Sequence, residues 1–390
     1  MKKKIQMLLA LYSLFSLNIY AQDTTQNKTV KTSFYQVSFI HPVGTNGRFS
    51  GAISNKLSFN ILSGYTGGLD GFELSLFSGV DKGPVKGCQI AGFSNVNLGS
   101  VNGSQIGCFS NVNLGSTKGL QIAGFLNLDA DSVEGIQISG FSNIIKGNAK
   151  GAQISGFCNV VNGNANGAQI SGFANVVTGD SKGMQISGFA NVAAGVSEDA
   201  QISGFINAAR VNKGLQLGFI NVADSSTGVS IGFMSIVRHG YFNLSLYTDE
   251  MLMANLSYKM GTHQFYNIWG VSANKEMWGL TYGLGKLFRS DKKVSINIDL
   301  TATNMNYKKI FEIQTCMKTK IESDLNIRLN NSFNLFAGLS YNVFVSDKIL
   351  DEDLQNYVRN ITKSDIQTTT FKSIRMFFWP GLSIGLKWEL

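Results

Sequence analysis

Apolar and polar residues alternate along most of this chain with a period close to two, the pattern of β-strands rather than of amphipathic helices. Between about residues 73 and 237 the alternation recurs about eleven times in units of 14 to 16 residues, with the form G-x-Q-I-[SA]-G-F-x-N-V-V-x-G-x-x-x. Val, Ile and Phe favour extended backbone, and Gly beside Asn, Asp or Ser marks a turn. Each unit is therefore predicted to be one strand, or two short strands bent at the inner Gly, followed by a turn.

A glutamine, a phenylalanine and an asparagine keep fixed places in the central units. If each unit is one coil of a parallel β-solenoid, identical residues stack about 4.8 Å apart. Gln and Asn columns then form ladders of amide hydrogen bonds, and the Phe column forms a stack of rings. The predicted ladder residues are Gln137, Gln153, Gln169, Gln185, Phe141, Phe157, Phe173, Phe189, Asn143, Asn159, Asn175 and Asn191.

A second architecture fits the same repeat, in which the units are strands of one continuous large β-barrel with Gln and Asn lining its lumen. Barrels alternate short and long connections, whereas these units share one kind, and no Tyr or Trp occurs from Thr66 to Gly240. At Gln216–Phe219 a unit loses one residue, which would invert a flat strand but can be absorbed at a Gly corner of a coil. These observations favour the solenoid.

After Gly240 the chain changes to strict alternation over longer segments, as in Val294–Thr301 and in the final GLSIGLKWEL. All four tryptophans lie here, and strands of about 9 to 11 residues suffice to cross a bilayer when tilted. The polar stretch 346–373 suits an outer loop. The predicted fold is all-β, a 16-residue-repeat β-solenoid-like region followed by an antiparallel, outer-membrane-barrel-like region. A soluble antiparallel sandwich is the alternative for this C-terminal part.

The first residues have the pattern of a secretory signal peptide. Three lysines, Lys2 to Lys4, precede a short apolar run, and Ala21 provides a small residue for cleavage. The expected organisation is a signal peptide at 1–21, N-terminal strands or a cap at 22–72, the repeat region at 73–237 and the barrel-like region at 238–390.

Composition excludes some classes of function. The formal net charge of +8 falls to +5 when the three leader lysines are removed (8 − 3), which is too mild and diffuse to indicate nucleic-acid binding. Cys88, Cys108 and Cys158 occupy different places in the repeat, so they are interpreted as small hydrophobic residues rather than as disulfide partners.

No constellation of catalytic, cofactor-binding or metal-binding residues is visible. His41, His239 and His263 are not spaced with each other or with Cys or carboxylates as metal ligands are. The stretch DADSVEG (129–135) lacks the Gly and Glu of a calcium loop and is interpreted as a polar turn. The sequence therefore predicts a protein that is not an enzyme and that needs no cofactor.

The repeat, together with VSIGFMSIVRHGYFNLSLY (229–247), resembles a family of bacterial surface-repeat proteins of leptospiral and Bacteroidetes type. The resemblance covers roughly residues 35 to 260. It implies a surface or outer-membrane location in a Gram-negative cell. The family has no established biochemical activity, so it implies no catalytic residues.

The expected function is that of a non-enzymatic structural or interaction protein of the outer membrane or cell surface, which displays the repeat domain after signal-peptide cleavage near Ala21. Its expected partners are outer-membrane lipid together with surface polymers, partner proteins or copies of the same chain. The alternative is an outer-membrane channel or transport barrel with a Gln/Asn-lined lumen, and solute-dependent conductance distinguishes the two.

Overall fold

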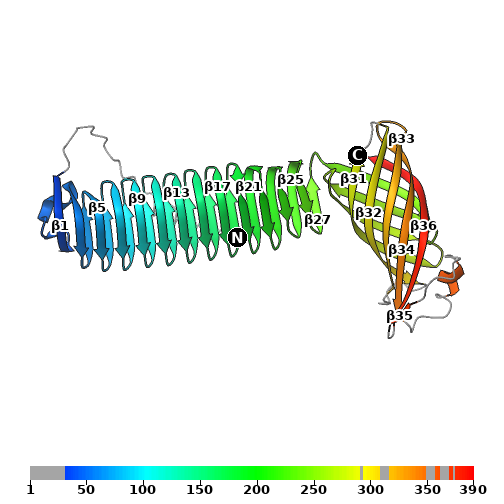
Figure 1. Cartoon of the computed structure of the whole chain (residues 1–390), viewed down its shortest axis with the longest axis horizontal. Coiled ribbons are helices and arrows are strands. Elements are labelled where there is room, and N and C mark those ends of the chain that lie inside the picture. Colours follow the sequence, from blue (N-terminus) through cyan, green and yellow to red (C-terminus); the bar gives the residue numbers. More distant parts are fainter. Residues whose placement is uncertain (1–30, 290–292, 308–315, 348–355, 361–368, 372–373) are drawn as a thin grey trace, which may run out of the picture.

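The computed structural model describes residues 31–289, 293–307, 316–347, 356–360, 369–371 and 374–390, and the predicted signal peptide lies outside them. The described chain forms a straight β-solenoid rod joined to a closed antiparallel barrel (Figure 1). The predicted fold class is confirmed. The repeats are coils of a solenoid, so they are not strands of one continuous barrel.

In most coils of the solenoid a longer strand is followed by a shorter one, and the elements of the solenoid include one 3-10 helix. They are β1 (Lys31–Ile40), β2 (Val43–Gly44), the 3-10 helix η1 (Gly47–Ala52), β3 (Ile53–Asn60), β4 (Ser63–Thr66), β5 (Gly68–Ser75), β6 (Ser78–Asp81), β7 (Val85–Ala91), β8 (Ser94–Asn97), β9 (Val101–Gly107), β10 (Ser110–Asn113), β11 (Thr117–Ala123), β12 (Leu126–Asp129), β13 (Val133–Ser139), β14 (Ser142–Ile145), β15 (Ala149–Ser155), β16 (Cys158–Val161), β17 (Ala165–Ser171), β18 (Ala174–Val177), β19 (Ser181–Lys182), β20 (Met184–Ser187), β21 (Ala190–Ser197), β22 (Ala200–Ser203), β23 (Ile206–Asn212), β24 (Leu215–Leu217), β25 (Ile220–Ser226), β26 (Val229–Ile231) and β27 (Met234–Val237).

One coil consists of a seven-residue and a four-residue strand, for example β15 and β16. Each strand pairs in parallel with its counterpart one coil later, so that β15 pairs with β17 and β16 with β18 in a register of 16 residues. The Gly-Phe pair forms the corner between the two strands, and the x-G-x segment forms the opposite corner. Of the two forms predicted for a unit, the bent pair of short strands is correct.

The coils extend N-terminal of the predicted repeat region, because β1 pairs in parallel with β3 and β3 with β5. From β1 to β26 the rod is about 60 Å long at the usual inter-strand spacing. At the shortened unit, Gln216 still pairs with Gln201 and Asn221 with Asn207. The missing residue is thus absorbed at the Gly-Phe corner.

Glycine stands two positions before each of the four predicted ladder glutamines, where neighbouring coils approach closely, and Asp199 takes the same place before Gln201. Gly151 has a φ of 121°, and a Cβ on it would lie 2.1 Å from the carbonyl oxygen of Gly135 in the preceding coil. The same close approach recurs at Gly167, whose Cβ would lie 2.1 Å from the Gly151 oxygen. A side chain at Gly151 or Gly167 would therefore require the neighbouring coil to shift.

The barrel has eight strands, closed by pairing between the first and the last. They are β28 (Tyr241–Asp249), β29 (Ala254–Gly261), β30 (Tyr266–Ala273), β31 (Met277–Arg289), β32 (Val294–Tyr307), β33 (Cys316–Arg328), β34 (Phe333–Asp347) and β36 (Ile374–Glu389), and the short β35 (Thr369–Phe371) pairs with β36. A one-turn helix at 356–360 lies within the connection between β34 and β36.

Candidate functional site

The predicted asparagine column forms a continuous ladder inside the solenoid. Asn143 Nδ2 donates to Asn159 Oδ1 at 2.8 Å and to the Ile154 carbonyl oxygen at 2.9 Å, and both asparagine side chains are buried. Asn159 donates in the same way to Asn175, which donates to Asn191. Because a carbonyl oxygen can only accept, the bond to it fixes the orientation of each amide.

The glutamine column is also buried, but its hydrogen bonds run in the opposite direction along the rod. Gln169 Nε2 donates back to Gln153 Oε1 at 2.7 Å, and Gln185 donates back to Gln169 at 2.8 Å. Gln137 Nε2 donates to Gln121 Oε1 at 2.6 Å, but its own Oε1 accepts no hydrogen bond. The glutamine ladder is therefore interrupted between Gln137 and Gln153.

The phenylalanine column lies on the outside of the rod, at the Gly-Phe corner. The rings of Phe141 and Phe157 are stacked with centroids 4.9 Å apart and planes within 3°. Phe157, Phe173 and Phe189 continue the stack at 4.9 Å. Each of these rings leaves about 40% of its surface exposed. The stack thus forms an apolar edge along the rod.

Three interior positions carry carboxylates instead of amides, and all three are buried. Glu73 lies in the glutamine column, and Asp81 and Asp129 lie in a second polar column that also holds Asn97 and Asn113. Burial raises the pKa of Asp129 to about 6, although Thr117, Asn113, Gln121 and Gln137 donate hydrogen bonds to it. Asp129 is therefore part of the interior, and the interpretation of this residue as part of a polar turn is wrong. The signal for it was present, since Asp129 lies 16 residues after Asn113.

The other two carboxylates lie in one coil near the start of the rod. Burial raises the pKa of Asp81 to about 6. Burial also raises the pKa of Glu73, and the negative charge of Asp81 raises it further. Asp81 is thus substantially protonated at mildly acidic pH.

The interior of the barrel holds a network of buried charges. Lys259 on β29 forms an ion pair with Asp299 on β32, and its Nζ lies 3.6 Å from Asp324 on β33. Lys387 on β36 lies 2.7 Å from Asp324, and the Tyr266 hydroxyl on β30 donates to Asp299 at 2.5 Å. All five side chains are buried. They come from five strands, so they link the walls of the barrel across its interior.

The end of the barrel remote from the rod is closed by apolar side chains. Phe344, Trp379 and Met305 belong to a buried cluster there, and Val358 of the helix at 356–360 packs into it. Beside the cluster, Trp379 Nε1 donates to Glu250 at 2.6 Å.

The outer wall of the barrel is apolar all round. Exposed apolar side chains point outward from each of the eight strands, and examples in strand order are Leu246, Leu256, Val271, Leu280, Leu300, Ile321, Leu339 and Ile384. Charged groups inside and apolar groups outside invert the usual arrangement of a protein in water.

The rod ends against this outer wall. The ring of Phe233, the last in the column, meets Trp269 edge-on at 4.3 Å and stacks on Tyr282 at 5.4 Å. The Tyr282 hydroxyl and Asn267 Nδ2 both donate to the Gly232 carbonyl oxygen, at 2.9 and 2.7 Å. These contacts fix the last coil of the rod to β30 and β31.

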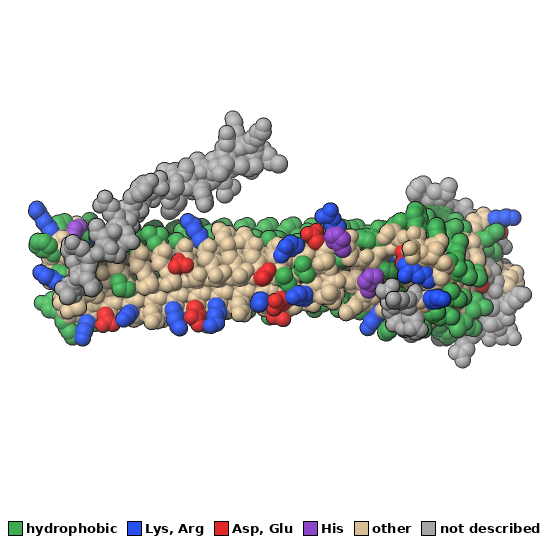
Figure 2. All heavy atoms as spheres, turned by 90° about the horizontal axis from the view of Figure 1, so that it is seen from above, with side chains coloured by type: hydrophobic (Ala, Val, Ile, Leu, Met, Phe, Trp, Pro, Cys, Tyr) green, Lys and Arg blue, Asp and Glu red, His purple; other side chains and the backbone are tan. Residues whose placement is uncertain are grey.

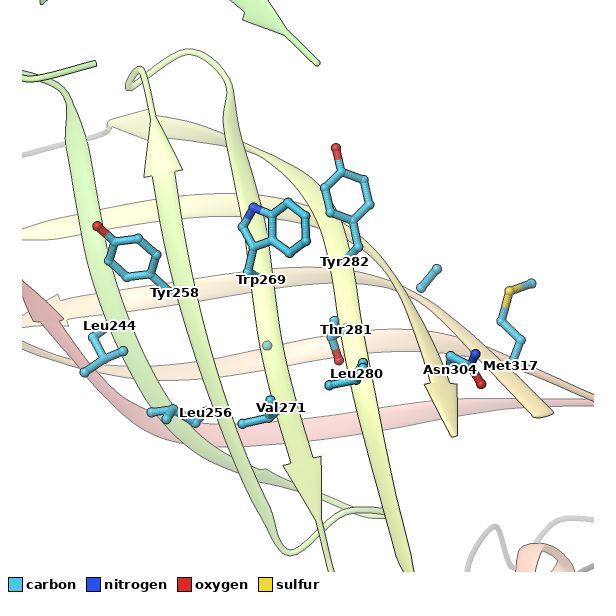
Figure 3. Close-up of a pocket in the computed structure, with 12 residues that line it drawn as sticks. Leu244, Leu256, Tyr258, Trp269, Val271, Leu280, Thr281, Tyr282, Asn304 and Met317 are labelled. Atoms are coloured by element: carbon cyan, nitrogen blue, oxygen red, sulfur yellow. The ribbon is translucent and has the colours of Figure 1, made fainter. Parts of the chain in front are cut away.

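An open apolar groove of about 530 Å³ begins at this joint and follows the outer wall (Figure 3). Tyr258, Trp269 and Tyr282 line its end nearest the rod, and Val271 and Leu280 line it further along. Its surface is nearly free of polar atoms, so it suits hydrocarbon rather than a polar substrate.

The described residues contain no cluster of three or more His, Cys, Asp or Glu side chains able to hold a metal ion. No helix among these residues is long and apolar enough to cross a membrane. The four cysteines, all in described segments, are free thiols.

The geometry defines a β-solenoid docked by its aromatic column onto an eight-stranded barrel with an apolar exterior. Comparisons with protein-family models, curated proteins and solved structures gave no match.

Proposed function

We propose that the C-terminal barrel is embedded in an outer membrane and that the protein is a non-enzymatic structural or interaction protein, which holds the rigid solenoid at that membrane. The observation that carries the proposal is the inverted barrel. Its outward side chains are apolar on all eight strands, while Lys259, Asp299, Asp324 and Lys387 are paired inside. Lipid satisfies such an exterior, whereas water does not.

The solenoid supports the second half of the proposal. Its interior is filled by ladders that depend on neighbouring coils, so it is stiff and extended and offers long uniform surfaces. Such surfaces suit polymers, partner proteins or copies of the chain.

The channel alternative receives no support from this geometry. The Gln and Asn columns are buried within the solenoid, as Gln169 and Asn175 illustrate, so they do not line a barrel lumen. The barrel interior is instead occupied by its own ion pairs.

The test is a single charge placed in the apolar wall. Leu339 on β34 is 70% exposed and pairs with Leu382 on β36 within the apolar wall. Leu339→Arg is expected to cost about 2–4 kcal/mol of membrane insertion. Carbonate extraction and the mobility of unheated and boiled samples on gels report insertion. The control is Leu114→Arg, on the exposed x-G-x corner of the solenoid. If native protein is released by carbonate, or if both variants insert equally well, the membrane proposal fails.

A further inference from the structure

The outward phenylalanines form one uninterrupted apolar edge along the rod. Eleven rings, from Phe77 to Phe233, are each 40 to 52% exposed. At about 80 Å² for each ring, they expose roughly 900 Å², compared with the roughly 300–600 Å² that is typical of the largest apolar patch on a monomer. Near the tip, Leu76 and Leu62 widen the edge. An exposed apolar surface of this size indicates a partner.

This edge also lacks charge. In every coil from Gln89 onward, the segment from the ladder position to the residue after the Asn position, such as Gln153–Val160, contains no charged residue. The charged side chains lie towards the opposite corner, as Lys146 and Lys150 do. In Figure 2, which views the rod from above, charged side chains gather mainly along one long side of the rod, and a smaller number lie on its other half. A polar partner would find no charge to pair with on the phenylalanine edge.

The edge is straight as well as apolar. Successive coils stack without visible rotation about the rod axis from β5 to β25 (Figure 1). Sheets ordinarily twist, and stacked side-chain ladders are what hold such sheets flat. The edge therefore faces a single direction over its whole length, as contact with a flat surface requires.

The edge is continuous with the apolar wall of the barrel. Its last ring, Phe233, packs on Trp269 and Tyr282. Val271 and Leu280 are the next outward-pointing residues on the same two antiparallel strands, two positions from Trp269 and Tyr282, and they are 51% and 56% exposed. The rod runs across the barrel axis rather than along it (Figure 1). The edge thus begins where the proposed lipid-facing wall has its aromatic rim, the usual depth of Trp and Tyr at a bilayer interface.

The barrel connections indicate the side on which the rod lies. At the end joined to the rod, where the C-terminus also lies, the strands are linked by the short segments 262–265, 290–293 and 329–332. At the other end the links 250–253 and 274–276 are equally short, but eight residues separate β32 from β33 (308–315) and 26 separate β34 from β36 (348–373). Outer-membrane barrels have short turns on the periplasmic side and longer loops outside.

We infer that the phenylalanine edge is a lipid-binding surface, which lays the solenoid along the periplasmic leaflet of the membrane that holds the barrel. This inference rests on the proposed function. A bilayer is the occupant that the geometry favours because inserting the barrel alone brings the edge to the membrane surface, with no second molecule required.

Cys108 provides a probe on this edge, since it is exposed and directly precedes Phe109. Full-length protein with Cys88→Ala and Cys158→Ala is labelled there with a fluorophore, while buried Cys316 stays unlabelled. The matched control carries Cys108→Gly and Ser116→Cys, which moves the label to the opposite corner of the same coil. Both are placed in nanodiscs of phosphatidylethanolamine and phosphatidylglycerol that contain doxyl-labelled lipid.

Quenching by doxyl lipid is expected to be at least about fivefold stronger at residue 108 than at residue 116. Equal quenching at the two positions would show that the rod projects away from the bilayer. A label at 108 that is shielded from iodide but not quenched by lipid, with disulfide cross-linking through Cys108 between chains, would assign the edge to a second copy and overturn the inference.

Tryptophan fluorescence separates this result from the proposed function. All four tryptophans belong to the barrel region, and Trp388 is exposed on its outer wall. If doxyl lipid quenches tryptophan but not the label at 108, the barrel is embedded and only the inference fails. If it quenches neither, the membrane proposal fails too. In cells, a membrane-impermeant maleimide is expected to label the Ser116→Cys variant only after the outer membrane is permeabilised, and labelling of intact cells would contradict the periplasmic placement.

Discussion

Replacing Asp129 by Asn tests how the solenoid accommodates a charge in its interior. Asp129 Oδ1 accepts from Thr117 at 2.6 Å and from Asn113 at 3.0 Å, and Oδ2 accepts from Gln137 at 2.7 Å. An asparagine at position 129 keeps Oδ1 as an acceptor for Thr117 and Asn113. It is also the residue type found at the equivalent position two coils earlier, Asn97. The substitution removes the charge and one acceptor and leaves the shape of the side chain almost unchanged.

The size of the effect follows from the pKa of Asp129. Burial raises this pKa from 3.8 to about 6. The carboxyl is protonated in both states below pH 3.8, so it costs no stability there. Between about pH 4 and 6 the unfolded chain releases the proton first, so stability falls as pH rises, by about 3 kcal/mol in total. Losing the acceptor for Gln137 costs about 1 kcal/mol. Asp129→Asn should therefore stabilise the solenoid by about 2 kcal/mol at pH 7.5 and not at pH 3.5.

The two parts of the protein can be followed separately in one denaturant titration of the full chain in detergent. Tryptophan fluorescence reports only the barrel region, and far-UV circular dichroism reports both parts. The control is Asp131→Asn, which changes an exposed residue of the adjacent turn. If Asp129→Asn leaves the stability at pH 7.5 unchanged, or if both variants shift stability equally, the argument that a buried carboxylate limits this region is refuted.

Two further predictions address the interiors of the two parts. Asp324→Ala removes an ion-pair partner from both Lys259 and Lys387 and should destabilise the barrel by about 3–5 kcal/mol, measured by heat modifiability on gels. The control, Glu134→Ala, breaks only exposed ion pairs on the rod and should change the stability of the rod by less than about 1 kcal/mol. Asn159→Leu removes the donor to the Ile170 carbonyl oxygen and to Asn175, and should lower the free energy of unfolding of the solenoid by at least about 2 kcal/mol, measured by denaturant titration. The control, Asn162→Leu, changes an exposed residue of the same coil and should be nearly neutral. Equal effects of the two variants would mean that the ladder adds no stability.

The 16-residue period allowed the coil and its columns to be predicted. When each unit forms one full coil, every residue lies beside the residue 16 positions later in the chain. The direction of the side chains could not be read from hydrophobicity. Gln169 and Ser171 are buried while Ile170 between them is exposed. For Gln169 the usual preference is reversed because its amide hydrogen-bonds to Gln153 and Gln185 in the neighbouring coils, which a reading of one unit does not reveal.

The joint between rod and barrel was not predictable either. Phe233 meets Trp269 and Tyr282 across 36 and 49 residues of chain (269 − 233 and 282 − 233), and nothing local distinguishes Phe233 from the other rings in its column. Asp129 was misinterpreted because its neighbours resemble a loop, although its place in the 16-residue register marks it as interior. Register is thus the more reliable guide in such a chain.

The identical contacts between coils make each coil a unit of length. From Gln153 to Asn191 the Asn and Gln ladders meet the same partners 16 residues before and after, so a duplicated unit can be inserted between two coils of this stretch without altering either neighbour. Each added copy lengthens the rod by about 4.8 Å and leaves its tip and its joint unchanged. The number of repeats therefore sets how far the tip of the rod lies from the barrel, in steps of one coil.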